Sequence, residues 1–361
     1  MAASRTDWLL SAPVYATSAK ADTALFPFLS RLLRREDLNA REAADFFRAL
    51  IDVNANAAQI AGALTALTAK GETHEELAGM AGVMRSATLK IGSPQKGMID
   101  IVGTGSSSAK TFNVSTAAAI VAAGAGLNVA KQSNRGFTSK AGSADVLSEL
   151  GVKVASEPDI AQTSLRGAGL SFLFAPKFHP QLRRVGDIRS SLGIRTCLNV
   201  LGLLANPASV SHQLIGVWHR SLVEPVAYAL ALLKTERAWI VHGSDGLDEL
   251  TLAGKTFVAE VQGQRVRTFM ISPEDFGLKS ARIEHLRTRS PKESAKLILD
   301  VLASRRRDEA RSLVVLNAAA ALVIGGIARD PMHAARMAEQ SIDSGQAQNK
   351  LDRLIQVTNK R

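Results

Sequence analysis

The fold is decided by residues 98–123, which read MIDIVGTGSSSAKTFNVSTAAAIVAA. A short apolar run, Met98–Val102, leads into a turn that contains two glycines, and an alanine-rich stretch, Ala117–Ala123, follows it. An apolar run of this length is typical of a buried strand, and an alanine-rich stretch favours a helix. Residues 98–123 therefore predict a strand, a polar turn and a helix, which together form one βα unit.

The same rhythm continues along the chain. Further short apolar runs alternate with helical stretches, and Gly, Ser, Asn or His follows each run within four residues: Leu127–Ala130, Leu170–Ala175, Leu214–Val217 and Ala238–Val241. This alternation is typical of a parallel sheet covered by helices, so we expect an α/β fold with a central, mainly parallel sheet. Ligands in such folds bind beyond the carboxyl ends of the strands. The loops that follow these runs are therefore the informative ones.

Helical patterns flank this region on both sides. Within residues 24–92, apolar residues recur at spacings of three and four, and Asn39 with Glu42 and Thr73 with Glu76 have the spacing of capping boxes. Gly71 is placed to end the helix before it. We expect four helices and no strand in this block. Further helices are expected in the C-terminal part, at Lys292–Ser304, Asp308–Gly326, Pro331–Ser344 and Ala347–Val357.

The first turn has the features of an anion site. Gly103 and Gly105 let the backbone approach an anion closely, and six hydroxyl side chains lie between them and Thr116. A helix that begins near Ser115 would add backbone amides that bind phosphate oxygens. The Gly-Lys-Ser/Thr spacing of the nucleoside-triphosphate loop is missing. A serine-rich turn with an ordinary N-cap explains the pattern equally well.

Two later segments carry cations. Lys131 and Arg135 follow the second run, with Asn134 between them, and such a pair can neutralise a pyrophosphate leaving group. A solvated basic loop is the alternative. Arg189 precedes a glycine-containing segment, and an arginine there can clamp a carboxylate through two hydrogen bonds. A surface ion pair on a helix is the commoner fate of a lone arginine.

The fifth apolar run leads into a candidate metal loop. Asp248 and Glu249 are adjacent carboxylates that follow this run, and Asp245 could orient the loop. Mg²⁺ prefers one or two carboxylates together with waters and substrate phosphates, so the pair is a natural ligand set. An acidic turn is the alternative. His242 is too isolated to indicate a general base.

Composition narrows the class of protein. The chain has 361 residues, 46% of them hydrophobic, which is typical of a globular protein with a large core. The single cysteine, Cys197, excludes internal disulfides and fits a reducing cytoplasm. We find no secretory leader, and the longest apolar stretches, such as Leu313–Ile327, are too short and too interrupted by glycine to span a bilayer.

The formal net charge of +11 favours anionic partners. The basic residues are scattered, with small clusters at Arg34–Arg35, Arg183–Arg184 and Arg305–Arg307, and no aromatic residues alternate with them to form stacking platforms. A solvated basic surface is therefore favoured over a nucleic-acid site, and a polyphosphate substrate fits the charge as well.

Taken together, the four loops resemble the anthranilate phosphoribosyltransferase family of tryptophan biosynthesis over about residues 24–358. Asp100–Gly105 with Thr111–Gly126 is similar to the family's phosphoribosyl pyrophosphate loop, and Lys131 with Asn134 and Arg135 to its Lys-His-Gly-Asn-Arg element. Arg189–Pro207 resembles its acceptor segment, and Val241–Leu250 its metal loop. Asn317–Leu322 and Ile342–Ala347 resemble its C-terminal helices.

The resemblance implies an architecture. Residues 1–22 would be an N-terminal extension, residues 23–93 a helical dimerisation domain, and residues 94–361 an α/β domain that binds phosphoribosyl pyrophosphate. Part of residues 180–210 would pack against the helical domain, and the active site would lie in the hinged cleft. A cytoplasmic homodimer that is not bound to a membrane is implied.

The resemblance also implies roles for individual residues. Ser115 would help to hold one Mg²⁺, and Asp248 and Glu249 would hold another. Lys131 and Arg189 would be catalytic. The donor and the aromatic acceptor would contact Gly103, Thr104, Ser107, Thr111, Asn113, Ser115, Thr116, Lys131, Asn134, Ser143, Arg189 and Gly202.

Several positions depart from the family pattern. The family's Gly-Asp-Gly is replaced by Ser106–Ser108, its His and Gly by Gln132 and Ser133, and the Pro of Gly-Pro-Leu by Leu203. Transfer of phosphoribose to anthranilate is the favoured function. The alternatives are a phosphoribosyltransferase for another aromatic acid, a catalytically silent relative that binds nucleic acid, and, less well supported, a nucleoside phosphorylase.

Overall fold

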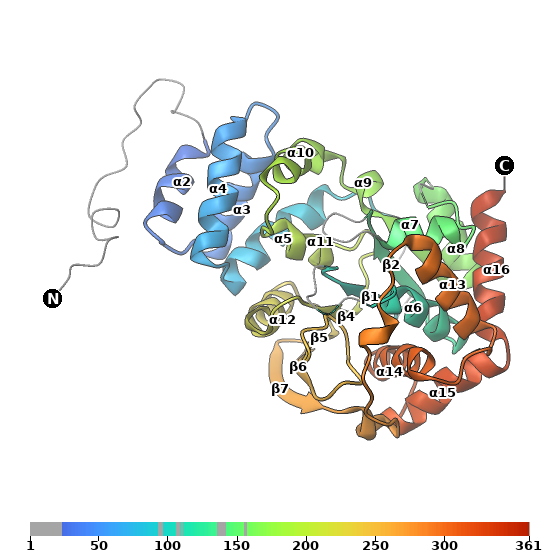
Figure 1. Cartoon of the computed structure of the whole chain (residues 1–361). Coiled ribbons are helices and arrows are strands. Elements are labelled where there is room, and N and C mark those ends of the chain that lie inside the picture. Colours follow the sequence, from blue (N-terminus) through green and yellow to red (C-terminus); the bar gives the residue numbers. More distant parts are fainter. Residues whose placement is uncertain are drawn as a thin grey trace.

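The computed structural model describes residues 24–92, 97–105, 109, 111–135, 142–154 and 157–360. Its described N-terminal part contains the four expected helices, which lie together at one end of the molecule (Figure 1). Both predicted capping boxes are confirmed. The side chains of Asn39 and Thr73 accept hydrogen bonds from the backbone N–H groups of Glu42 and Glu76, respectively. The side chains of these glutamates accept in turn from the backbone N–H groups of the two capping residues. Gly71 follows the third helix at φ +88°. The helices are α2 (Phe26–Leu33), α3 (Ala40–Ile51), α4 (Ala57–Lys70) and α5 (His74–Ala87).

A seven-stranded sheet forms the centre of the α/β part, in the order β3-β2-β1-β4-β5-β6-β7. The five predicted strands are confirmed, and they pair in parallel. The antiparallel hairpin β6–β7 was not predicted, although residues 256–271 carry β-branched and aromatic residues on either side of a turn at Gly263. The strands are β1 (Ile99–Gly103), β2 (Val129–Ser133), β3 (Leu170–Phe174), β4 (His212–Gly216), β5 (Arg237–Gly243), β6 (Thr256–Gln262) and β7 (Arg265–Ile271).

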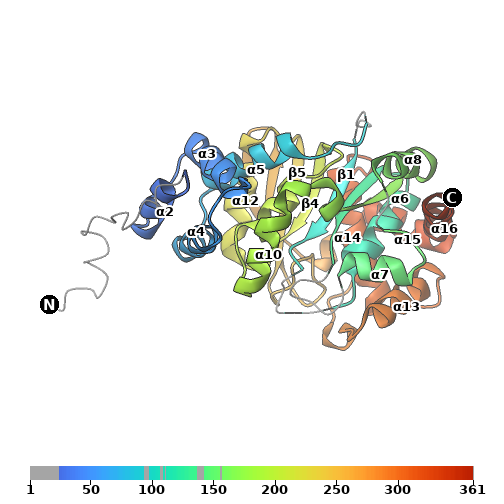
Figure 2. The ribbon, with the colours of Figure 1, turned by 90° about the horizontal axis from the view of Figure 1, so that it is seen from above.

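Helices cover both faces of the sheet (Figures 1 and 2). The four predicted C-terminal helices, α13 to α16, are confirmed. Within the described ranges, every helix is too short or too polar to span a lipid bilayer. The remaining helices are α6 (Val114–Gly124), α7 (Ser143–Glu149), α8 (Pro158–Ala168), α9 (Ala175–Phe178), η2 (Pro180–Leu182), α10 (Arg183–Leu192), α11 (Leu198–Leu204), η3 (Arg220–Leu222), α12 (Val223–Leu232), η4 (Pro273–Phe276), η5 (Glu284–Leu286), α13 (Pro291–Leu302), α14 (Glu309–Ile324), α15 (Pro331–Asp343) and α16 (Gln346–Asn359).

The two faces of the sheet enter two different cores, because alternate residues of a strand point to opposite sides. Ile99 and Ile101 of β1 belong to one core, with α6 and α14. Val102 of β1 and Ile215 of β4 belong to the other, which continues into the N-terminal helices. The sheet therefore holds its strand ends rigidly between two layers of helices.

The segment that contains α10 and α11 lies beside the N-terminal helices, far from them in sequence (Figure 1). Val185 and Leu201 are buried in the same core as the helical block. Arg184 also donates hydrogen bonds to the backbone carbonyls of Val53 and Ala55. Apolar burial and these hydrogen bonds join this segment to α3 and α4.

His179 lies at the junction of the two parts and gives the fold a pH-dependent element. Its ring is 3% exposed, and burial lowers its pKa to about 4. Its Nδ1 lies 3.1 Å from Thr88 Oγ1, whose hydroxyl donates to the carbonyl of Met84. Thr88 therefore accepts from a neutral imidazole protonated on Nδ1.

Acid should destabilise the wild-type chain through His179. The unfolded histidine gains a proton near pH 6.5, while the folded one stays neutral down to about pH 4. Stability is therefore lost as the pH falls through 6.5, by about 2 kcal/mol between pH 7 and pH 5. We expect His179→Gln to remove this loss, as measured by urea unfolding at both pH values. His285→Gln, at an exposed position, is the control and should keep the wild-type slope.

Candidate active site

The loops at the carboxyl ends of β1, β2 and β5 meet around a cavity of about 480 Å³. Every predicted site residue in the described part of the chain lines it, whereas Ser107 lies outside the described residues. The predicted residues that the structure brings together are Gly103, Thr104, Thr111, Asn113, Ser115, Thr116, Lys131, Asn134, Ser143, Arg189, Gly202, Asp248 and Glu249.

Asp248 is fixed against the turn after β1. Its Oδ2 accepts a 2.8 Å hydrogen bond from Thr104 Oγ1 and a 2.7 Å hydrogen bond from the backbone N–H of Gly105. The side chain is buried. The predicted anion turn and the predicted metal loop are therefore in direct contact in this structure.

Glu249 lies at the beginning of α6. Its Oε1 accepts from the backbone N–H of Ser115 at 2.9 Å and from the Ser115 hydroxyl at 2.5 Å. A carboxylate is stabilised here because the first amides of a helix carry partial positive charge and have no partner within the helix. The first turn of α6, which the sequence predicts to bind phosphate, therefore also binds the carboxylate of Glu249.

The two carboxylates create a negative, poorly hydrated centre. Burial, followed by repulsion from Asp248, raises the pKa of Glu249 to about 8, against the lowering effect of the Ser115 hydrogen bonds. Burial also raises the pKa of Asp248. The raised pKa values indicate that nearby positive charge does not fully balance the negative charge of these two adjacent acids. A cation bound between the two carboxylates would balance that charge.

A magnesium ion fits these residues. No cluster of three or more His, Cys, Asp or Glu side chains occurs among the described residues. Mg²⁺ does not need one, because it takes one or two carboxylates and completes its octahedron with waters and phosphate oxygens. Asp248 and Glu249 supply two carboxylates, and the cavity beside them leaves room for the remaining oxygen ligands.

Lys131 lies in the middle of β2 and lines the same cavity as the two acids. Its Nζ donates a 2.6 Å hydrogen bond to the carbonyl of Ile101, and the side chain is buried. Burial lowers the pKa of Lys131, while the carboxylates of Asp100, Glu249 and Asp248 raise it. Burial raises the pKa of Asp100 to about 6, against the effect of Lys131. Lys131 therefore contributes positive charge to a largely acidic centre.

Residues outside the cavity hold the metal loop in shape. Asp245 Oδ1 accepts from the N–H of Leu247 at 3.2 Å, and its Oδ2 accepts from the Thr251 hydroxyl at 2.9 Å. Asn317, on α14, bonds to both the N–H and the carbonyl of Leu250, each at 3.0 Å. The loop that carries Asp248 and Glu249 is thus held on both sides, which favours fixed positions for the two carboxylates.

The other end of the cavity is less acidic. Arg189 from α10 and Leu203 from α11 line it together with Gln132 of β2. A Cβ on Gly202 would lie 4.0 Å from the amide nitrogen of Gln132, so the two residues are neighbours. Burial lowers the pKa of Arg189. This arrangement places a guanidinium, an amide and apolar atoms where a planar acid could bind.

Part of the lining was not predicted from the sequence. Arg287, Thr288 and Arg289 form the loop before α13 and reach the same cavity. No local pattern separates these arginines from the other basic residues of the chain. Packing between segments far apart in sequence brings this loop to the cavity. Ser294 on α13, the helix that follows the loop, donates to the side chain of Asn113 at 2.9 Å.

Known proteins of one family match nearly the whole chain. It is 46% identical over 320 residues to the anthranilate phosphoribosyltransferase of Rhodospirillum rubrum, covering 89% of this chain and 92% of that protein. It is 42% identical over 328 residues to that of Thermoanaerobacter sp. (strain X514), covering 91% and 97%. The chain belongs to the anthranilate phosphoribosyltransferase family. The resemblance indicated by the sequence motifs is therefore confirmed.

Two domain families and two solved structures agree with this assignment. Residues 26–88 match the glycosyl transferase family helical bundle domain, and residues 95–348 match the a/b domain of the same family. The anthranilate phosphoribosyltransferase of Thermus thermophilus superposes with a TM-score of 0.86 at 35% identity, over 92% of this chain and 99% of that one. That of Saccharomyces cerevisiae, in complex with PRPP and Mg, gives 0.85 at 28% identity, over 94% and 98%. The predicted fold class is confirmed.

Proposed function

We propose that the chain transfers the 5-phosphoribosyl group of phosphoribosyl pyrophosphate to the amine of anthranilate and releases pyrophosphate. The observation that carries this proposal is the contact of Asp248 and Glu249 with the turn at Thr104 and Ser115, in one cavity with Arg189. The relative from Saccharomyces cerevisiae was solved in complex with PRPP and Mg and, in a second structure, with 4-fluoroanthranilate, which supports both halves of the reaction.

The donor would bind at the acidic end. Asp248 and Glu249 would hold Mg²⁺, with Ser115 beside them, and the ion would neutralise charge that develops on the departing pyrophosphate. The turn at Gly103–Gly105 and the start of α6 offer backbone amides to phosphate oxygens. The hydroxyl of Thr116 is buried and has no hydrogen-bond partner in the described part of the chain, so it remains available to a ligand.

Lys131 would stabilise the leaving group electrostatically. Its ammonium is buried and already fixed by the carbonyl of Ile101, so little reorganisation is needed during the reaction. An aromatic amine is nucleophilic without the help of a strong base. The protein would therefore act by orienting the acceptor against C1 of the ribose and by excluding water.

The direct test follows anthranilate fluorescence. We expect the signal to fall when phosphoribosyl pyrophosphate and Mg²⁺ are both present, and to stay constant when either is omitted. The control replaces anthranilate with aniline, which lacks the carboxylate. Constant fluorescence at high protein concentration with both components present would contradict the proposal.

Arg189 gives a prediction for the acceptor. It would bind the anthranilate carboxylate, and a charge-assisted hydrogen bond contributes roughly 1.5–3 kcal/mol. We therefore expect Arg189→Gln to raise the KM for anthranilate roughly 10- to 100-fold, with the KM for the donor changed less than threefold. Arg195→Gln, at an exposed position on the same segment, is the matched control. An unchanged KM for anthranilate would show that Arg189 does not bind the acceptor.

A different aromatic acid is a second candidate acceptor. Gln132 and Leu203 line the acceptor end, at positions where the family pattern has His and Pro. The Oε1 of Gln132 is buried without a hydrogen-bond partner among the described residues, so it can accept from a substrate N–H or O–H. A panel of aromatic acids, scored by pyrophosphate release, distinguishes the candidates. The acceptor with the highest kcat/KM identifies the substrate.

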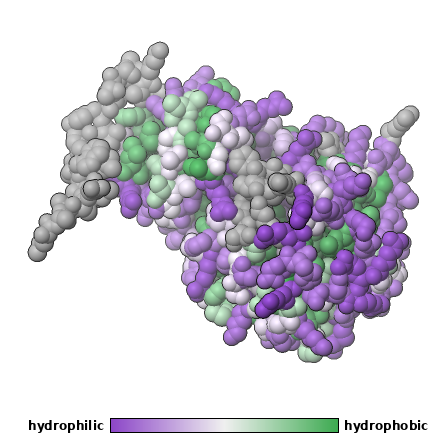
Figure 3. Space-filling model, in the orientation of Figure 1, coloured by the Kyte–Doolittle hydropathy of each residue, from purple (hydrophilic) through white to green (hydrophobic). Residues whose placement is uncertain are grey.

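We also propose a homodimer through the helical block. Apolar surface gathers over the N-terminal helices in Figure 3. Among the residues of this block, Leu33 is 41% and Val53 81% exposed. Exposed apolar patches of this kind mark interaction surfaces. We expect light scattering to give twice the chain mass of 38.4 kDa, and Leu33→Glu to shift the species toward the monomer. A monomeric wild-type chain would contradict the proposal.

A further inference from the structure

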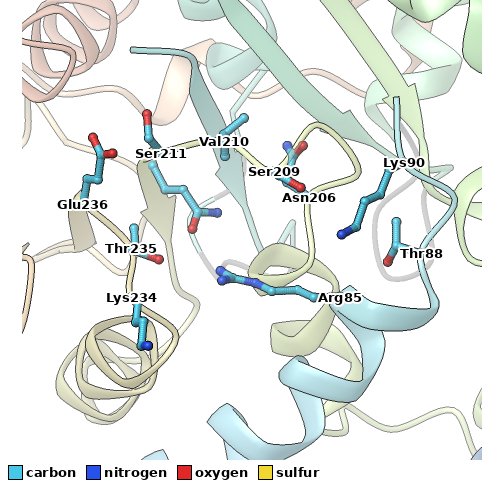
Figure 4. A pocket seen from close by; sticks show the side chains of 11 residues that line it. Arg85, Thr88, Lys90, Asn206, Ser209, Val210, Ser211, Lys234, Thr235 and Glu236 are labelled. Carbon is cyan, nitrogen blue, oxygen red and sulfur yellow. The ribbon is translucent and has the colours of Figure 1, made fainter. Parts of the chain in front are cut away.

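A second cavity, of about 310 Å³, lies at the opposite end of the sheet from the candidate active site. Its walls come from the end of α5 and the residues after it, and from the residues that precede β4 and β5 (Figure 4). We call it the seam cavity, because residues of both the helical block and the α/β part line it. Its lining residues are Arg85, Thr88, Lys90, Asn206, Ser209, Val210, Ser211, Gln213, Lys234, Thr235 and Glu236.

Arg85 is a partly buried cation that has no carboxylate partner among the described residues. Its Nε donates to the carbonyl of Leu204 at 2.6 Å, and its Nη1 donates to the carbonyl of Leu233 at 3.1 Å. These carbonyls lie at the ends of α11 and α12, where a cation is favourable. Its Nη2 makes no hydrogen bond, and no carboxylate pairs with it, within the described residues. Burial lowers its pKa to about 10, which leaves it charged at neutral pH.

The cavity as a whole is positive. Arg85, Lys90 and Lys234 are cationic and Glu236 is anionic, so the lining has a net charge of +2. In Figure 4 the guanidinium of Arg85 and the ammonium of Lys90 both point toward the middle, whereas Glu236 lies at the far rim. A dianion would balance this charge, and a phosphate group offers Arg85 and Lys90 several acceptor oxygens at once.

A polar wall completes the cavity. Gln213 is 1% exposed; its amide nitrogen donates to the carbonyl of Leu203, but its Oε1 is buried without a partner in the described part of the chain. Asn206 is held rigidly beside it by bonds to Asp100 Oδ2 and to the carbonyl of Ala130, at 2.7 and 2.8 Å. A buried acceptor without a donor is unfavourable, so a ligand hydroxyl would satisfy Gln213.

From these contacts we propose that the seam cavity binds a small phosphate monoester that also carries a hydroxyl group. Arg85 and Lys90 bind the phosphate, Lys234 adds charge at the rim, and Gln213 accepts from the hydroxyl. Residues from both parts of the molecule contact the same ligand, so an occupied cavity favours one relative placement of the helical block and the α/β part.

Glycerol 3-phosphate is a suitable probe, and calorimetry measures its binding without any need for turnover. We expect one site per chain in the wild type. We expect Lys90→Gln combined with Lys234→Gln to weaken the Kd roughly tenfold or more, because charge-assisted contacts are lost. Lys279→Gln removes an exposed charge outside the cavity and is the matched control, which should bind as the wild type does.

Further measurements show where the probe binds and which of its chemical groups the protein recognises. Arg289→Gln removes an exposed cation from the lining of the candidate active site and should leave binding unchanged. Inorganic phosphate should bind more weakly than glycerol 3-phosphate, and glycerol should not bind. The proposal is overturned if the wild type binds no probe, if the double variant binds as tightly as wild type, if Arg289→Gln abolishes binding, or if inorganic phosphate binds equally well.

Discussion

Replacing Asp248 by Asn and Glu249 by Gln together is expected to lower phosphoribosyl transfer by roughly a thousandfold. A bound divalent ion contributes several kcal/mol to transition-state stabilisation, and each 1.4 kcal/mol is a factor of about ten in rate. Both amides keep an oxygen that can accept the hydrogen bonds from Thr104, Gly105 and Ser115. The loss should therefore come from the missing charge. Steady-state kcat over a Mg²⁺ titration measures it.

The thermal stability of the metal-free double variant should not fall with its activity. Burial and repulsion from Asp248 raise the pKa of Glu249 to about 8, so the metal-free fold keeps this carboxyl mostly protonated at pH 7, whereas the unfolded chain ionises it. This difference lowers the stability of the metal-free wild type as the pH rises above 4.5. The neutral double variant should therefore unfold at the same temperature as the metal-free wild type or at a higher one. Mg²⁺ with pyrophosphate should raise the wild-type midpoint and leave that of the variant unchanged.

A surface control separates this effect from a general loss of negative charge. Glu224→Gln neutralises an exposed acid on α12 and should keep both activity and metal response. The metal assignment is wrong if the double variant keeps a tenth of the wild-type activity, or if both proteins respond to Mg²⁺ in the same way.

Much of the architecture could be predicted because its signals are local. The capping boxes at Asn39 and Thr73 depend on residues three positions apart. The parallel strands are short apolar runs, four of which end in Gly or Ser, and the loops that follow them meet because parallel strands end at one edge. The hairpin β6–β7 was missed, although β-branched and aromatic residues lie on both sides of Gly263.

Contacts between residues far apart could not be predicted in the same way. Asn317 hydrogen-bonds to Leu250, which lies 67 positions earlier in the chain, and Ser294 hydrogen-bonds to Asn113, which lies 181 positions earlier. Arg287 and Arg289 reach the cavity through the same packing. Nothing in the residues around them indicates a partner, because packing of α13 and α14 against α6 decides these contacts. Likewise, the seam cavity combines residues from three separate segments.

Gly216→Ala is expected to have the second large effect. Gly216 ends β4, and a Cβ there would lie 1.6 Å from the carbonyl oxygen of Asp248 and 2.4 Å from its carbonyl carbon. The neighbouring strand β1 ends in Gly103 at the same register, where a Cβ would lie 3.1 Å from the same oxygen. These two glycines leave the space in which the backbone of Asp248 lies.

The added methyl group must displace the metal loop, because the atoms it meets are backbone atoms rather than a flexible side chain. Misplacing reacting groups by about 1 Å lowers rates roughly 100-fold, and overpacking costs about 1–3 kcal/mol. We therefore expect kcat to fall at least that far, with a lower urea midpoint and weaker Mg²⁺ binding.

Gly186→Ala provides the matched control for Gly216→Ala. Gly186 lies within α10, and a Cβ there would meet no atom within 4 Å. Alanine is favoured over glycine inside a helix by roughly 0.5–1 kcal/mol, so this variant should be as stable as the wild type or slightly more stable, with full activity. Wild-type kinetics for Gly216→Ala would show that Asp248 need not lie where this structure places it. The close approach of β4 to the metal loop would then have no bearing on catalysis.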